Sequence, residues 1–154
     1  MFDKNKVLYG FFNDDDFLRI SEAIKKAEST TAGEIKISIK EKRSFAQKKK
    51  TIMELAAEDF DRLGMRNTRD KTGILIYLLL SEKKFFILAD EGINNKVEQS
   101  VWDSIRDKMG RKFSLGHFAD GIIEGIEEIG KVLSKHFPIK PDDVNELSDK
   151  VELG

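Results

Sequence analysis

Gly73–Leu80 of the 154-residue chain reads GILIYLLL, an uninterrupted apolar run. The run lacks polar alternation, which is typical of a central strand that is covered on both faces. It is far shorter than the ~20 residues that a membrane-spanning helix needs. We therefore predict an α/β domain that is built around this buried strand.

The residues that follow this strand predict a β-hairpin. Residues 81–84 read SEKK and are polar, whereas residues 85–89 read FFILA, which indicates a turn and a returning strand. Asp90–Asn95 end the hairpin and offer N-caps to a third helix. The apolar stripe of that helix begins at Val97, and Gly110 is predicted to close it.

Two helices and a strand are predicted upstream of the central strand. Asn13 and the three acids after it cap a first helix. Residues 34–40 read EIKISIK and alternate between apolar and polar side chains, which predicts a half-exposed strand. From Ser44 to Leu63, Phe45 and other apolar residues recur at helical spacing, which predicts a second amphipathic helix. Gly64 suits the C′ position at the end of that helix.

The last predicted helix has an apolar stripe from Phe118 to Leu133, with Gly121 and Gly125 favouring close packing. The order of helix, strand, helix, hairpin, helix and helix predicts a three-layer α/β/α sandwich. Its small mixed β-sheet would be covered by helices on both faces. We assign residues 1–138 to a single domain and residues 139–154 to a flexible acidic C-terminal tail.

The composition argues against several classes of function. The 27 basic and 28 acidic residues nearly cancel, so we expect no nucleic-acid partner. The absence of cysteine excludes disulfides, thiolate catalysis and cysteine zinc sites. The polar start and short apolar runs predict neither a secretory signal nor direct membrane insertion. We therefore expect a cytoplasmic protein that is a monomer.

Oxygen ligands gather at one end of the predicted sheet. If the helix between the first two strands is a right-handed crossover, both strands begin at the same end, so Glu34 approaches Asp70. In the antiparallel hairpin the second strand ends there too, which adds Asp90, Glu91 and Asn94. Carboxylate and amide oxygens suit a hard cation, so the sequence predicts a Ca²⁺ or Mg²⁺ site. Helix capping and solvation explain the same residues without a metal.

Three basic residues beside Asp70 support an alternative hypothesis. Arg66, Arg69 and Lys71 would hold a phosphate while a metal polarised it, as in a metal-assisted phosphatase. The same residues also fit a reading as solvated loop charges. Lys48–Lys50 form a basic patch, but the patch lacks the interleaved exposed aromatic residues that favour nucleic-acid binding. Because no nucleophile can be identified, a binding protein is favoured over an enzyme.

Three passages of the sequence resemble the TPM domain family, which includes thylakoid-lumen photosystem II repair proteins and bacterial membrane-anchored proteins. Residues 30–39 (TTAGEIKISI) resemble the family's Thr, Gly and Glu before an apolar strand. Residues 70–93 (DKTGILIYLLLSEKKFFILADEGI) are similar to its strand, hairpin and Gly-rich exit. Residues 113–130 (FSLGHFADGIIEGIEEIG) look like its last helix. A short single-domain bacterial subgroup is the most similar, through Trp102 and the ending HFPIKPDDVNELSD.

This resemblance implies a three-layer α/β/α fold and a divalent-cation site. It also implies, for the plant branch, acid phosphatase activity on phosphomonoesters. Asp70 matches the family's acid before the strand glycine, and Glu34 matches the acid after the first glycine. The last acid of the family's exit is replaced by the amide Asn94. We expect a Ca²⁺- or Mg²⁺-binding interaction module whose partner is a membrane-anchored relative or another protein, contacted through the acidic tail.

Overall fold

A four-stranded sheet is the middle layer of the computed structural model, which describes residues 10–139 and 151–153. The strands lie in the order β3-β2-β1-β4. β1 pairs in parallel with β2, which pairs antiparallel with β3, so the sheet is mixed as predicted. The strands are β1 (Glu34–Lys40), β2 (Gly73–Leu79), β3 (Lys84–Ala89) and β4 (Glu152–Leu153).

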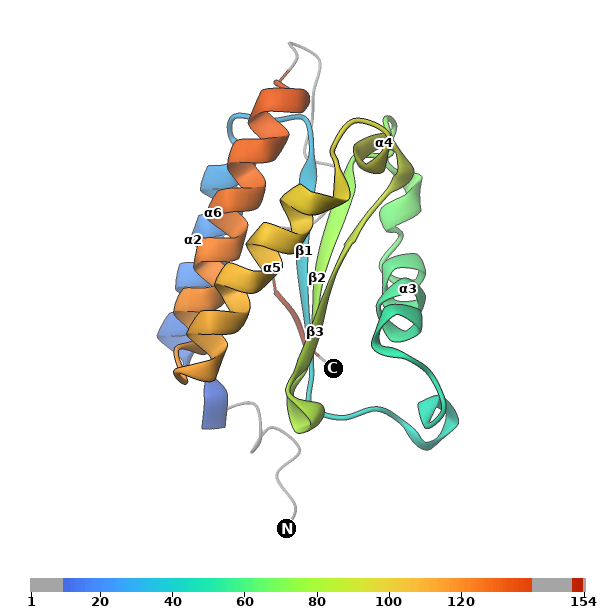
Figure 1. The fold of residues 1–154 in the computed structure, drawn as a ribbon, viewed down its shortest axis with the longest axis vertical. Coiled ribbons are helices and arrows are strands. Elements are labelled where there is room, and N and C mark those ends of the chain that lie inside the picture. The colour runs from blue at the N-terminus through green and yellow to red at the C-terminus, as the bar shows by residue number, and fades with distance from the viewer. Residues whose placement is uncertain (1–9, 140–150, 154) are drawn as a thin grey trace.

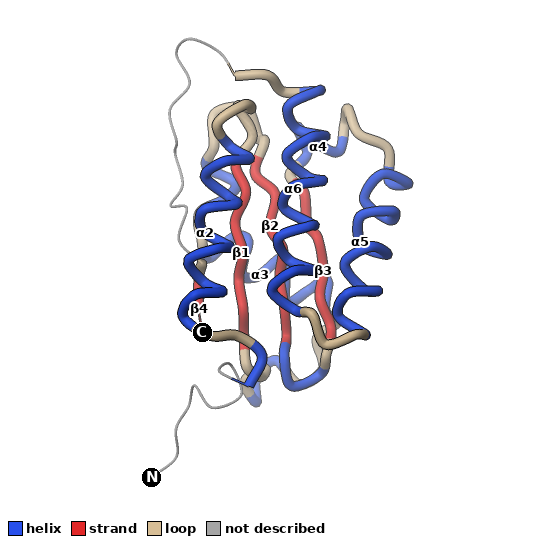
Figure 2. Tube along the Cα trace, turned by 90° about the vertical axis from the view of Figure 1, so that its left-hand side faces the viewer, coloured by secondary structure: helices blue, strands red, loops and turns tan. Residues whose placement is uncertain are grey.

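Helices cover both faces of this sheet, which confirms the predicted three-layer sandwich (Figure 1). Figure 2 shows three helices side by side on one face: α2 (Asp14–Glu28), α6 (Phe118–His136) and α5 (Gln99–Ser114). The other face is covered by α3 (Ile52–Arg62). Shorter elements connect the layers: η1 (Phe45–Gln47), η2 (Met65–Asn67), η3 (Leu80–Glu82) and α4 (Glu91–Asn94). None of the described helices is long and apolar enough to cross a membrane.

Strand β2 is buried on both faces, as its apolar run predicts. Its side chains alternate between a larger core beneath α2, α5 and α6 and a smaller core beneath α3. The first set is Ile74, Ile76 and Leu78, and the second is Leu75, Tyr77 and Leu79. The strand therefore joins the two cores into one folded unit.

Strand β1 is also enclosed on both faces, so the prediction of a half-exposed strand was wrong. Its isoleucines enter the larger core, while its polar face turns toward α3. There Ser38 donates a hydrogen bond to the carboxylate of Asp59, and the Lys40 ammonium lies 3.7 Å from it. Lys36 pairs with Glu152 of β4 at 3.1 Å. The alternating pattern would place these polar side chains in water. They are buried instead, because polar groups of other elements pair with them.

The segment from Ser44 to Leu63 does not form one continuous helix. Thr51 acts as the N-cap of α3, so the helix begins well after the predicted start. Arg43 donates hydrogen bonds to three backbone carbonyls between residues 47 and 50, which holds the preceding loop away from a helical path. Phe45 therefore lies outside α3 and is 89% exposed, contrary to its predicted place on a buried stripe.

The helix ends agree with the sequence in part. Asn13 caps α2 through a reciprocal capping box, and Gly64 has a φ of 72° after α3, as predicted. Asp90 caps the short α4 instead of the long α5. Gly110 lies inside α5, which continues to Ser114, so the predicted end at this glycine was wrong. One glycine in a helix interior costs only about 1 kcal/mol, which packing of the helix readily offsets.

Gly121 and Gly125 allow the close packing of α6 against α5 that the sequence predicts. A Cβ at Gly125 would lie 2.5 Å from the sulfur of Met109. A Cβ at Gly121 would lie 2.6 Å from the ring of Phe113. The two glycines thus set the separation between these helices.

Part of the region predicted as a flexible tail belongs to the sheet. Glu152 and Leu153 pair in parallel with Ser38 and Ile39 of β1, which corrects the prediction for these two residues. The physical reason is the edge of β1, whose backbone groups accept another strand. The prediction for residues 140–150 lies outside the described residues.

Tyr77 should make the stability of the domain fall at high pH. Burial, reinforced by the charge of Asp59, raises the pKa of Tyr77 to about 12, whereas the unfolded chain has the ordinary value of about 10. The stabilising contribution is complete below the unfolded pKa and is lost as the pH rises through the folded one. We expect roughly 1 kcal/mol of the free energy of unfolding to disappear between pH 9 and pH 11. Urea denaturation of the protein and of Tyr77→Phe measures this, and an equal loss in both would refute the assignment.

Candidate metal centre

The backbone brings the predicted ligand segments to one end of the sheet. Glu34 lies opposite Gly73 in the parallel register, and its N–H donates to the carbonyl of Thr72 at 3.0 Å. The N–H of Asp90 donates to the carbonyl of Gly73 at 2.9 Å. The starts of β1 and β2 and the end of β3 therefore meet, as the crossover and hairpin argument predicts.

Gly92 fixes how α4 sits against the loop before β2. A Cβ at this position would lie 2.5 Å from the carbonyl oxygen of Lys71, and it would also overlap the carbonyl of Asp70. Only a glycine allows the helix backbone to approach the loop backbone this closely. The approach places Asp90, the N-cap of α4, beside the loop of residues 66–72.

Asp90, like Glu34, is a buried carboxylate of this region, with 4% of the residue exposed. Its Oδ1 accepts a hydrogen bond of 2.7 Å from the N–H of Glu91, and it lies 3.9 Å from Nη1 of Arg66. Its Oδ2 is buried and has no hydrogen-bond partner among the described residues. The Oγ1 of Thr68, from the adjoining loop, is buried and unpartnered in the same sense. Buried polar atoms without partners are costly, so a ligand at these oxygens would lower the free energy of the site.

The other predicted ligands differ in their surroundings. Glu34 is buried, whereas Asp70 is exposed and lies 3.2 Å from Nη2 of Arg69. The exposed Asn94 donates a hydrogen bond of 2.9 Å from its amide nitrogen to the carbonyl of Ala89. Glu91 is exposed. Within the part of the chain that the structure describes, no three acidic or histidine side chains cluster closely enough to hold a metal.

The donors at this sheet end still fit a hard cation. Ca²⁺ and Mg²⁺ bind carboxylate, hydroxyl, amide and backbone oxygens and keep water ligands, so they do not require three acids. The unpartnered oxygens of Asp90 and Thr68 are of this kind. Sequence reasoning missed Thr68, because a threonine in a polar loop carries no signal until its burial is known.

The three predicted phosphate ligands all have partners within the protein. Arg66 donates to Asp61, which raises the pKa of the guanidinium further above its ordinary value, and it stacks 5.2 Å from the ring centroid of Phe60. Arg69 pairs with Asp70, as described above. Lys71 donates to the backbone carbonyl of Arg66. Each of the three charges thus already contacts a group of the protein, and Arg66 and Arg69 do so as surface ion pairs.

Comparison with known proteins relates the chain to one family. The model of the TPM domain matches residues 7–132. The solved structure of the BA42 protein from the psychrophilic bacterium Bizionia argentinensis is 34% identical. It has a TM-score of 0.85 over 94% of this chain and 96% of that chain. No curated protein matches.

Two more distant structures share the fold alone. The N-terminal domain of a P. gingivalis protein is 17% identical, with a TM-score of 0.67 over 83% of this chain and 80% of that one. The N-terminal domain of the cg2496 protein from Corynebacterium glutamicum is 14% identical. Its TM-score is 0.61 over 80% and 75% of the two chains.

Proposed function

Because this chain belongs to the TPM domain family, we propose that it is a Ca²⁺- or Mg²⁺-binding module that contacts another protein. The observation that supports an ion is the buried Oδ2 of Asp90, which lacks a partner among the described residues. A carboxylate oxygen that is shielded from water and unpaired is stabilised most strongly by a cation.

The proposed ligand set starts from Asp90 and draws on the loop that packs against Gly92. Thr68 would add its hydroxyl oxygen, Asp70 its carboxylate and Asn94 its amide oxygen. Glu34 and Glu91 would supply negative charge around the site. The ion would add positive charge to that of Arg66, whose Nη1 lies 3.9 Å from Oδ1 of Asp90.

Arg66 has opposite roles in the two hypotheses. Its guanidinium repels a cation at Asp90, so Arg66→Ala should increase affinity for Ca²⁺ or Mg²⁺. In the phosphatase alternative, the same substitution removes a phosphate ligand and should lower turnover. We favour ion binding, because Arg66, Arg69 and Lys71 each already contact an oxygen of the protein.

Titration of the metal-free protein with Ca²⁺ or Mg²⁺ should shift the amide resonances of residues 68–72 and 90–94. We expect Asp90→Asn to weaken the affinity at least tenfold, since it removes the charge while asparagine remains a good N-cap for α4. Asp103→Asn, an exposed change on α5, is the matched control and should bind like the unaltered protein.

Equal shifts in the protein and in Asp90→Asn would contradict the site. A phosphomonoester assay on the same samples tests the alternative, which requires turnover that depends on the metal and falls with Arg66→Ala. For the interaction role, the family resemblance suggests a membrane-anchored relative as partner. Ion-dependent co-sedimentation with that partner would test it, and the proposed contact through residues 140–150 lies outside the described part of the chain.

A further inference from the structure

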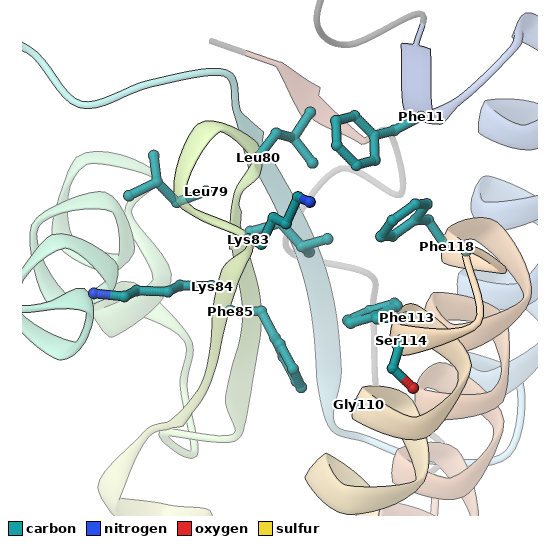
Figure 3. A pocket seen from close by; sticks show the side chains of 12 residues that line it. Phe11, Leu79, Leu80, Lys83, Lys84, Phe85, Gly110, Phe113, Ser114 and Phe118 are labelled. Atoms are coloured by element: carbon teal, nitrogen blue, oxygen red, sulfur yellow. The ribbon is translucent and has the colours of Figure 1, made fainter.

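An open apolar pocket of about 480 Å³ lies at the end of the sheet opposite Asp90. Four phenylalanines from different elements line it, and Figure 3 shows their rings around the open space: Phe11, Phe85, Phe113 and Phe118. Phe113 packs edge-on against Phe85 at 4.9 Å, so the rings form a continuous wall. The volume falls within the roughly 300–1,000 Å³ that is typical of small-molecule sites.

Gly110 keeps one wall of this pocket open. It lies in the interior of α5, where a glycine costs about 1 kcal/mol relative to alanine. A Cβ at this position would meet no atom within 4 Å, so no packing constraint on the described structure requires a glycine. The residue lines the pocket, and a larger side chain there would project into the space. Gly110 thus weakens the helix and keeps the apolar space open. We take this as an indication that a ligand occupies the space.

Lys83 places a positive charge at the same pocket. It occupies the left-handed region with a φ of 52°, which is costly for a residue with a side chain. Figure 3 shows the side chain directed toward the side of the pocket where Phe118 lies, whereas Lys84 points away from the rings. No carboxylate within residues 10–139 or 151–153 pairs with Lys83. The nearby Glu82 is held by Arg43 at 2.6 Å.

We propose that this pocket binds a linear fatty acid, with the acyl chain among the phenylalanines and the carboxylate at Lys83. The apolar lining excludes a polar ligand, since burying polar groups without partners is costly. The Lys83 ammonium favours an anionic headgroup over a cationic or neutral one. This inference is independent of the ion site, which lies at the other end of the strands.

Calorimetric titration with decanoate, below its micellar concentration, tests the proposal on the full chain. We expect saturable binding to one site, and at least tenfold weaker binding of decyltrimethylammonium, which has the same chain and the opposite charge. Lysophospholipid of the same chain length is the third ligand. Binding of the lysophospholipid with equal affinity would overturn the assignment to a free fatty acid, because that ligand has no carboxylate to meet Lys83.

Two variants localise the binding. Gly110→Leu should reduce decanoate affinity at least tenfold, and it should not lower the unfolding temperature, because leucine favours the helix and its Cβ meets open space. Lys83→Glu should reverse the preference, so that decyltrimethylammonium binds more tightly than decanoate. Unchanged decanoate binding in Gly110→Leu, or no binding to the unaltered protein, would overturn the proposal. A third outcome would also overturn it: the unaltered protein forms dimers that decanoate does not dissociate, and Gly110→Leu is a monomer. A second copy of the chain would then be the occupant of the pocket.

Discussion

Replacing Gly92 with alanine should lower the free energy of unfolding by about 3 kcal/mol, at the upper end of the usual cost of overpacking. The added methyl group would overlap the carbonyl oxygens of Asp70 and Lys71, and both are backbone atoms that no side-chain rotation can move. α4 would have to leave the loop, which would separate Asp90 from residues 66–72. Urea denaturation followed by the fluorescence of Trp102, the only tryptophan, measures the loss.

Gly110→Ala is the matched control, because it adds the same methyl group to a helix at a position without neighbours. It should raise the free energy of unfolding by about 0.5–1 kcal/mol, through higher helix propensity and a less flexible unfolded chain. A Gly92→Ala protein as stable as the original would show that the loop can retreat at no cost. The Ca²⁺ or Mg²⁺ affinity of that variant should still fall, because the retreat moves residues 66–72 away from Asp90.

The central strand and its hairpin could be predicted because their signals are local. An unbroken apolar run requires cover on both faces, and an antiparallel hairpin necessarily brings Asp90 beside the start of β2. The meeting of Glu34 with Gly73 needed one further assumption, the right-handed crossover, which almost always holds for parallel strands. The position of the candidate site was therefore accessible from the sequence.

The details of that site were not accessible, because they depend on burial. Asp90 reads equally well as a helix cap or a metal ligand, and it does cap α4. Only the enclosed Oδ2, which has no hydrogen-bond partner among the described residues, favours the ligand interpretation. Gly110 was interpreted as a helix end for a similar reason, since the open space beside it is formed in part by Phe11 and Phe85, which are distant in sequence.

The burial of β1 could not be predicted from its local sequence either. Its polar face has the spacing of a solvated surface, yet Ser38 is fully buried. The partner that makes this possible is Asp59, on a helix that begins later than its periodicity suggests. The local pattern EIKISIK cannot predict that a carboxylate about twenty residues away, that of Asp59, pairs with Ser38.

Asp59→Ala should therefore destabilise the protein by about 3 kcal/mol, the lower bound for breaking a buried charged contact. Asp59 is 5% exposed, accepts hydrogen bonds from Ser38 and Arg62, and lies 3.7 Å from the Lys40 ammonium. Without it, the buried hydroxyl of Ser38 loses its acceptor, and the Lys40 ammonium, whose side chain is 21% exposed, loses the carboxylate beside it. Arg62 adds less, because about half of its side chain is in water, where ion pairs contribute little.

Asp61→Ala provides the matched comparison, since it removes the same group from the same helix two residues later. The side chain of Asp61 is 60% exposed and pairs with Arg66 at the surface, so its loss should change the free energy of unfolding by less than about 0.5 kcal/mol. If the two substitutions change the free energy of unfolding equally, the apolar contacts alone hold α3 against the sheet. A large difference would show that Asp59 allows a strand of alternating polarity to lie inside the sandwich. Adding Ser38→Ala to Asp59→Ala should then recover part of the loss, because it removes the hydroxyl left without its acceptor.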